Sequence, residues 1–143
     1  MEGLSSVQQE AIVHAIGLAE NQTSGEIRVA IDRKLQGTAL DRALYYFTKL
    51  GMEKTSLRNG VLIYLAIDDH QFAIIGDKGI NDKVPAGFWD KTKEHMLEFF
   101  KKGELAEGVI AGVMDAGLQL SLFFPRAHDD VNELPNDLLL DKS

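Results

Sequence analysis

An unbroken apolar run from Gly60 to Ile67 is the clearest pattern in this chain. Its length and its β-branched residues are typical of a strand that is buried on both faces. The next three residues, Asp68 to His70, predict a turn, and the segment from Gln71 to Ile75 predicts a second strand that returns beside the first. The pattern therefore predicts an antiparallel hairpin whose first strand is central in a sheet.

Apolar residues at helical spacing predict four helices. In the first of them, Ser6 and Gln9 have the spacing of a capping box. Pro125 follows the last periodic residue and is expected to stop the fourth helix, because proline cannot continue the backbone hydrogen-bond pattern. The predicted helices span about 6–21, 40–52, 82–103 and 104–124.

Alternating β-branched residues in the segment Glu26–Asp32 predict another strand. A strand, a helix and a second strand of this length suggest a right-handed crossover, which sets segments 26–32 and 60–67 parallel. The sheet is thus expected to be mixed, within a single α/β domain over residues 1–125. Residues 126–143 are expected to form an acidic tail, whose run Leu138–Leu140 docks on the domain, pairs with another copy or is disordered.

Composition narrows the functional classes. A chain of 143 residues with 45% hydrophobic residues has the size of one ordinary domain. Its formal net charge of -7, with scattered basic residues, disfavours a nucleic-acid partner. The chain has no cysteine, which excludes thiolate metal sites, disulfides and cysteine nucleophiles.

The chain shows no feature that predicts insertion into a membrane. Its N-terminus has neither a basic region nor an apolar region of the kind found in secretory signals. The stretch 109–124 is apolar, but Asp115 and Gln119 interrupt it and it falls short of about 18 apolar residues. We therefore expect no membrane span and a soluble, cytoplasmic protein.

Acidic groups are expected to gather at one end of the sheet. Because the hairpin strands run in opposite directions, Asp77 returns beside Asn59, and the parallel strand begins there with Glu26. Asp82 follows close behind. Calcium and magnesium prefer carboxylate and carbonyl oxygens, so Glu26, Asp77 and Asp82 are the predicted ligands of a divalent cation.

The run Gly76-Asp77-Lys78-Gly79 adds a loop to this prediction. Gly76 and Gly79 permit positive φ and let the backbone approach an ion or a phosphate, and with Asn59 they complete the predicted binding loop. The alternative interpretation is a plain turn, which such a glycine-flanked aspartate often forms.

A second acidic cluster, at the opposite end of the sheet, consists of Asp32, Asp68, Asp69 and His70. Turn chemistry explains the last three, since aspartate in a tight turn hydrogen-bonds its own backbone. His14, His95 and His128 have no partner at ligand spacing. The phosphate-loop, nucleophile-elbow, zinc-protease and EF-hand signatures are all missing from the sequence.

Three motifs, in this order and spacing, resemble the TPM domain family, which includes thylakoid-lumen phosphatase-like proteins and their bacterial relatives. The resemblance covers roughly residues 5–125. The motifs are Thr23-Ser-Gly-Glu26-Ile-Arg-Val, Asn59-Gly-Val-Leu-Ile-Tyr-Leu-Ala and Ala73-Ile-Ile-Gly76-Asp77-Lys-Gly79-Ile.

The resemblance implies an α/β/α sandwich, in which helices cover both faces of a small mixed sheet. It also implies binding of calcium or another divalent cation such as magnesium, and acid phosphatase activity as in some plant members. By position, the family's site corresponds to Glu26, Asn59, Gly76, Asp77 and Gly79, with Asp82 as a further candidate.

This chain departs from typical members, which carry a signal peptide and often a downstream membrane anchor. It resembles instead a soluble bacterial subgroup. Two functions follow as expectations. The first is a calcium-binding module that binds a protein partner through its loop, and the alternative is a metal-dependent phosphatase that hydrolyses phosphomonoesters. The sequence offers no clear general acid or nucleophile for the alternative.

Overall fold

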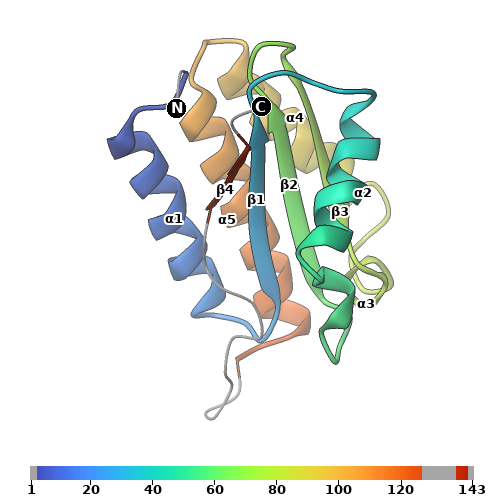
Figure 1. The fold of residues 1–143 in the computed structure, drawn as a ribbon. Coiled ribbons are helices and arrows are strands. Elements are labelled where there is room, and N and C mark those ends of the chain that lie inside the picture. The colour runs from blue at the N-terminus through green and yellow to red at the C-terminus, as the bar shows by residue number, and fades with distance from the viewer. Residues whose placement is uncertain (1–2, 127–137, 142–143) are drawn as a thin grey trace.

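The sheet is built around β2 (Gly60–Ala66), in which every residue is buried. The structure is a computed structural model and describes residues 3–126 and 138–141. The four strands lie in the order β3-β2-β1-β4 (Figure 1). The other three strands are β1 (Glu26–Asp32), β3 (Gln71–Gly76) and β4 (Leu138–Asp141).

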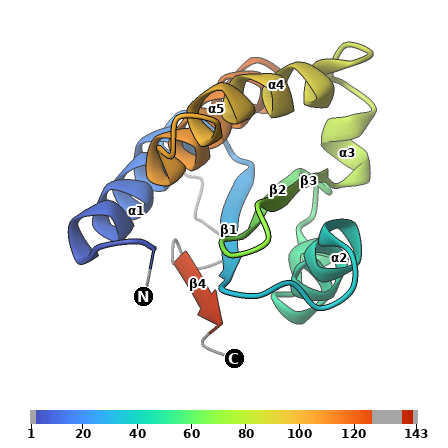
Figure 2. The same cartoon turned by 90° about the horizontal axis from the view of Figure 1, so that it is seen from above.

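Helices cover both faces of this sheet, as the family resemblance implies. One face carries α1 (Ser6–Glu20), α4 (Phe88–Phe100) and α5 (Leu105–Phe123), and the other carries α2 (Ala39–Lys49) (Figure 2). Alternate residues of β2 therefore enter two separate hydrophobic cores, because successive side chains of a strand point to opposite faces. The predicted α/β/α sandwich with a mixed sheet is confirmed.

The strand directions also agree with the sequence prediction. Strands β1 and β2 pair in parallel, with Glu26 opposite Gly60. Strands β2 and β3 form the predicted antiparallel hairpin, with Val61 opposite Gly76. In the turn between them, His70 has a φ of 54° and thus takes the left-handed conformation.

The cap of α1 and the start of the helix after β3 differ from the prediction. The capping box of α1 is formed by Ser5 and Gln8, because Ser5 has the extended backbone that a capping residue needs. The segment after β3 forms a separate turn of helix, α3 (Lys78–Asn81), before α4 begins at Phe88. Asp77 caps this turn, and capping chemistry rather than apolar periodicity creates it.

The apolar run near the C-terminus docks on the domain as β4. It pairs in parallel with β1, with Val29 opposite Leu138. The other residues of the acidic tail, 127–137 and 142–143, lie outside the described residues.

Helix α5 is long and apolar enough to cross a membrane by length and composition alone, with a mean hydropathy of 1.3. Half of this apolar stretch is buried inside the domain, where α5 lies between α1 and α4. A core helix of a globular domain has the same length and composition, so these two properties alone do not assign α5 to a membrane.

The glycines of α5 lie against neighbouring helices. A Cβ atom at Gly117 would stand 2.7 Å from the Ala19 Cβ of α1. In contrast, a Cβ at Gly17 of α1 would meet nothing within 4 Å. The close approach of α1 and α5 therefore depends on the missing side chain at Gly117.

This contrast yields a matched pair of substitutions. Gly17→Ala is expected to raise the free energy of unfolding by about 0.5–1 kcal/mol, because alanine favours the helix and meets open space. Gly117→Ala is expected to lower it by about 1–3 kcal/mol, because the new methyl overpacks the contact with Ala19. Urea unfolding of both variants checks this, and equal effects would contradict the helix contact.

Candidate functional site

Asp77 lies at the end of β3 and is held by an arginine. Its side chain is 6% exposed, and both carboxylate oxygens accept hydrogen bonds from Arg58, from Nε at 2.7 Å and from Nη2 at 2.9 Å. The backbone N–H of Lys78 also donates to Oδ1, at 2.8 Å, which caps α3. Asp77 is thus an anchored carboxylate with a two-pronged cationic partner.

Arg58 differs from its partner in exposure and in backbone conformation. Its side chain is 49% exposed, and its φ of 52° lies in the left-handed region that residues other than glycine rarely adopt. The hydrogen bond to Asp77 and the charge of Asp77 raise the pKa of Arg58, and the charge of Glu53 raises it further. Glu53 Oε2 is buried and has no hydrogen-bond partner among the described residues. The Arg58 guanidinium therefore interacts with two carboxylates, with Asp77 through hydrogen bonds and with Glu53 through its charge.

The predicted loop glycines lie tightly against neighbouring backbone and side chains. A Cβ at Gly79 would lie 2.0 Å from the carbonyl oxygen of Leu57, and the N–H of Gly79 donates to the carbonyl of Arg58 at 2.7 Å. A Cβ at Gly76 would lie 2.9 Å from Trp89. Neither glycine has a positive φ. They let chain segments approach each other closely around the Asp77 cap.

Asp82 stands at the far end of the short helix. It is the C-terminal capping residue of α3 and is exposed. Beside it, Asn81 donates from Nδ2 to the carbonyl of Gly76 at 2.7 Å and accepts from Trp89 Nε1 at 2.8 Å. A cavity of about 280 Å³ opens next to this pair, between α3 and the start of α4.

Glu26 and Asp77 do not meet. They lie on the two sides of Gly60, since Glu26 pairs with Gly60 and the N–H of Asp77 donates to its carbonyl at 2.8 Å. The buried side chain of Met52 covers this glycine, with its methyl 3.3 Å from where a Cβ would be. An apolar side chain thus packs over the glycine that stands between the two predicted ligands.

Glu26 belongs to a different group, at the open edge of β1. The Ile27 N–H donates to Glu20 Oε2 at 2.7 Å, and Arg28 Nη1 donates to the Ile27 carbonyl at 2.6 Å. Arg28 also pairs with Glu20 at 3.1 Å and with Glu26 at 3.5 Å. All three charged side chains are buried. They close the edge of β1 in the stretch that β4 does not reach.

The remaining predicted residue, Asn59, is buried beside the same strand end. Its Nδ2 lies 3.5 Å from Ser24 Oγ, and its Oδ1 has no hydrogen-bond partner among the described residues. In residues 3–126 and 138–141, no group of three or more Asp, Glu or His side chains is arranged to hold a metal ion. The site is therefore a set of charge-paired carboxylates at the strand ends.

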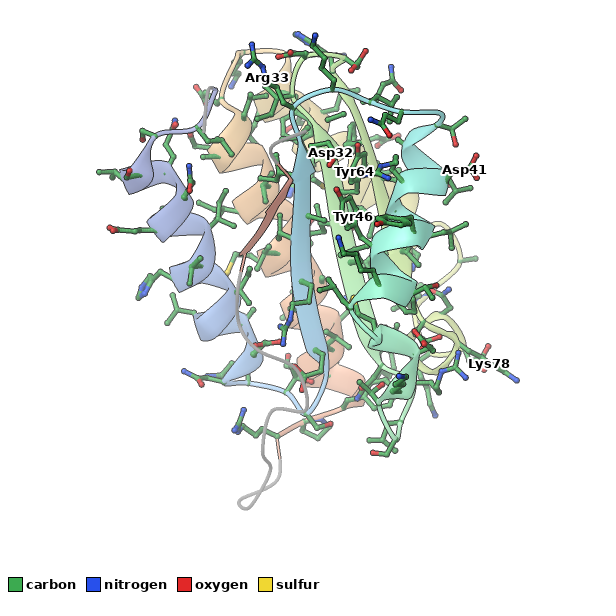
Figure 3. All side chains as sticks on the ribbon, in the orientation of Figure 1. Asp32, Arg33, Asp41, Tyr46, Tyr64 and Lys78 are labelled. Atoms are coloured by element: carbon green, nitrogen blue, oxygen red, sulfur yellow. The ribbon has the colours of Figure 1, made fainter. Side chains whose placement is uncertain are left out.

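The opposite end of the sheet holds a buried polar network around Asp32 (Figure 3). Tyr64 donates to Asp32 Oδ2 at 2.7 Å, Arg42 donates to the same oxygen at 3.0 Å, and Tyr46 donates to Oδ1. Burial, followed by the hydrogen bond to Asp32, raises the pKa of Tyr64. Asp32 was predicted to group with the turn residues, whereas it lies on the same strand face as the buried Ala30 and is itself buried.

The turn residues of that end satisfy local backbone and side-chain groups. Asp69 accepts from the N–H of Leu35 at 2.6 Å, and Asp68 accepts from Arg33 Nε at 3.3 Å. The Arg33–Asp68 pair is exposed on both sides, at 45% and 42%. The turn interpretation of Asp68 to His70 agrees with these contacts.

Sequence reasoning missed the arginines. Arg28 has a signal, since it stands two residues after Glu26 in an alternating strand and so faces the same side. Arg58 has none, because it meets Asp77 only through the register of the hairpin. Glu53 also has no signal in the sequence, because its position near Arg58 depends on the turn of 3-10 helix at Met52–Lys54.

The fold and the site together define a small α/β/α domain with a mixed sheet and buried, arginine-paired carboxylates at both sheet ends. The chain belongs to the TPM domain family, whose model matches residues 2–118. No curated protein sequence matches it.

Solved structures agree with this assignment. The chain is 44% identical to the BA42 protein from the psychrophilic bacterium Bizionia argentinensis, with a TM-score of 0.89 over 96% of this chain and 95% of that one. The N-terminal domain of a P. gingivalis protein is 24% identical, with a TM-score of 0.69 over 89% and 85% of the two chains. The N-terminal domain of the cg2496 protein from Corynebacterium glutamicum is 15% identical, with a TM-score of 0.56 over 82% and 74%. The last two show the fold alone.

The buried acidic pair predicts a pH dependence of stability. Burial raises the pKa of Glu20 above its ordinary value of 4.5, against the lowering effect of the Ile27 N–H and of Arg28. The folded chain therefore holds this proton more tightly than the unfolded chain does. The resulting stabilisation is complete below the unfolded pKa and is lost as the pH rises through the folded pKa.

Glu20→Gln removes this titration. The melting temperature of the natural chain minus that of the variant is expected to fall as the pH rises from about 4 to about 8. Glu10→Gln, at an exposed glutamate of the same helix, is the matched control and should give a nearly constant difference. Thermal melts across this pH range measure both, and parallel curves for Glu20→Gln would contradict the buried proton.

The Asp32 network predicts a second effect on stability. Tyr64→Phe removes a hydrogen bond to a buried carboxylate and is expected to lower the free energy of unfolding by about 1–3 kcal/mol. Tyr45→Phe, at a half-exposed ring of α2, should change it by less than about 0.5 kcal/mol. Denaturant unfolding measures the free energy of unfolding of both variants. If Tyr64→Phe leaves that free energy unchanged, Arg42 and Tyr46 satisfy Asp32 without the Tyr64 hydroxyl.

Proposed function

We propose that this TPM domain is a non-enzymatic binding module that responds to a divalent cation, with calcium replacing the Arg58 guanidinium at Asp77. The observation that carries the proposal is the unequal exposure of this ion pair. The carboxylate is nearly buried and fixed by the cap of α3, while the guanidinium is half exposed. The anion is therefore held in place, and its cationic partner is free to move into solvent.

Charge requirements favour such an exchange. A buried carboxylate is costly without a cationic partner, so Asp77 needs either Arg58 or an ion. Calcium brings two positive charges and binds oxygen ligands at flexible distances. Glu53, whose charge acts on Arg58 and whose Oε2 is buried without a hydrogen bond, supplies a second carboxylate once the guanidinium leaves. We assign Asp77 and Glu53 as the ligands, because Asp82 stands at the far end of α3 and is not grouped with them among the described residues.

Release of Arg58 would act on the loop that follows. The Arg58 carbonyl accepts a hydrogen bond from the Gly79 N–H, and the Leu57 carbonyl lies close to Gly79, so the segment 76–85 depends on the backbone conformation of Arg58. A left-handed non-glycine residue costs of order 1–3 kcal/mol. Relaxation of this conformation on cation binding would shift α3 and the adjoining cavity, which is how the ion would tune binding of a protein partner.

The phosphatase alternative draws its support from the family resemblance. In the described part of the chain, the Asp77 carboxylate contacts Arg58 and the Lys78 N–H, and neither group supplies a general acid or a nucleophile for hydrolysis. We therefore place binding before hydrolysis.

Calcium titration tests the proposal. Calcium is expected to raise the melting temperature by mass action and to shift the backbone amide signals of residues 76–82. Asp77→Asn should abolish both effects. Arg58→Gln should lower the melting temperature in chelator, because it leaves a buried carboxylate unpaired, and should increase the affinity for calcium, because it removes the competing cation.

The exposed pair Arg33–Asp68 provides the matched control. Arg33→Gln should change neither the calcium affinity nor the shifts at residues 76–82. Signals that move mainly at Asp68 to His70 would locate the ion at the other end of the sheet, and an absence of any shift at millimolar calcium would sink the site. Hydrolysis of p-nitrophenyl phosphate at acidic pH, if abolished by Asp77→Asn, would favour the phosphatase alternative.

A further inference from the structure

An apolar groove runs along the outer face of α1 and α5. The two helices touch where Gly117 meets Ala19, and the larger side chains on either side of this contact stand up into solvent. Leu18, Met114 and Leu118 are 49%, 45% and 61% exposed. They flank a groove of about 260 Å³, whose lining residues are Leu18, Ala19, Gln22, Met114, Gly117, Leu118 and Ser121.

The apolar surface extends beyond the groove. On α5, Leu122 is 64% exposed and lies one turn after Leu118. On α1, Val7 is 74% exposed and lies three turns before Leu18. Single exposed apolar residues need no explanation, whereas apolar stripes on two adjacent helices mark an interaction site.

The charges on these helices indicate the kind of partner. Neither α1 nor α5 contains a lysine or an arginine, although the chain has 15 of them. The charged residues that reach the surface of the two helices, apart from His14, are acidic: Glu10, Glu107 and Asp115, of which Asp115 also contacts His95 of α4 at 3.0 Å. The groove is thus apolar along its floor and carries only negative formal charge on its helices.

We propose that the α1–α5 groove is a docking surface for a basic amphipathic helix of a partner protein. Such a helix lays its apolar face between two helices, and its lysine or arginine flanks meet the acidic residues. The groove is smaller than the roughly 300–1,000 Å³ of a typical small-molecule site, so it suits inserted side chains rather than a free ligand. The net charge of -7 steers a basic partner toward the domain.

The same charges argue against two other occupants. An anionic membrane surface is attracted by clusters of lysine and arginine, which these helices lack. A second copy of the chain would bring the same carboxylates to the contact and the same net charge, which costs free energy at a shared interface. Both occupants therefore serve as outcomes that the test separates.

The test uses a model peptide of leucine and lysine, about 18 residues or five turns long, as the probe. Its counterpart, with glutamate in place of lysine, is the charge control. Backbone amide shifts map each peptide on the full chain, and a titration gives the dissociation constant. The lysine peptide is expected to shift signals along α1 and α5, and the glutamate peptide is expected to leave them unchanged.

Substitutions then locate the contact. The double variant Leu18→Ser, Leu118→Ser should weaken binding of the lysine peptide by about tenfold or more, since both side chains flank the groove. Leu40→Ser with Leu44→Ser, on the exposed stripe of α2, is the matched control, because those leucines are 56% and 47% exposed. All of these positions are at the surface, so thermal melts should show that both variants remain folded.

Four results would each overturn the proposal. Equal binding of the two peptides would remove the charge argument, and shifts centred on α2 would move the surface elsewhere. Binding of the chain to vesicles of phosphatidylglycerol, lost in the Leu18–Leu118 variant, would identify a membrane as the occupant. A dimer in sedimentation that the same variant abolishes would identify a second copy. Calcium is absent throughout, so failure here leaves the cation site untouched.

Discussion

Buried carboxylates must be neutralised, and this requirement organises both ends of the sheet. A carboxylate moved out of water loses several kcal/mol of solvation even after the protein relaxes, unless a cation and hydrogen bonds replace the water. Each buried acidic residue of the described chain therefore has an arginine: Asp32 has Arg42, Asp77 has Arg58, and Glu20 and Glu26 share Arg28. The three arginine side chains are 15%, 49% and 3% exposed, so the Arg58–Asp77 pair is the most accessible of the three to solvent.

Most of the fold could be predicted from the sequence, because apolar periodicity is a local property. The run at residues 60–67 determines the central strand, and the alternation at residues 26–32 determines its parallel neighbour. What could not be predicted is α3, because a single hydrogen-bonded turn at Asp77 has no apolar repeat. The placement of β4 was also out of reach, because Leu138–Leu140 suits docking, dimerisation or disorder equally well by composition.

The site could be predicted only in its location. The hairpin register brought Asp77 to the same end as Glu26, as expected from strand direction. The sequence could not show that Met52 covers the glycine between them, because that contact comes from a turn of 3-10 helix outside both strands. It also could not pair Asp77 with Arg58, since opposite charges distant in the sequence carry no mark of their contact. The acidic residues predicted to share one cation are thus found in separate ion pairs, Asp77 with Arg58 and Glu26 with Arg28.

The position of β4 also affects the order of events in synthesis. The edge of β1 from Val29 to Asp32 is completed by residues made more than a hundred positions later. At a translation rate of about 5–20 residues per second, that edge stays open for roughly 5 to 20 seconds. The N-terminal part of the same edge is covered earlier. The side chains of Glu20 and Arg28 bond the backbone of Ile27 there, and all three residues are synthesised at almost the same moment. The Glu20–Arg28 pair thus shortens the unpaired edge of β1 that a nascent chain would expose to mispairing.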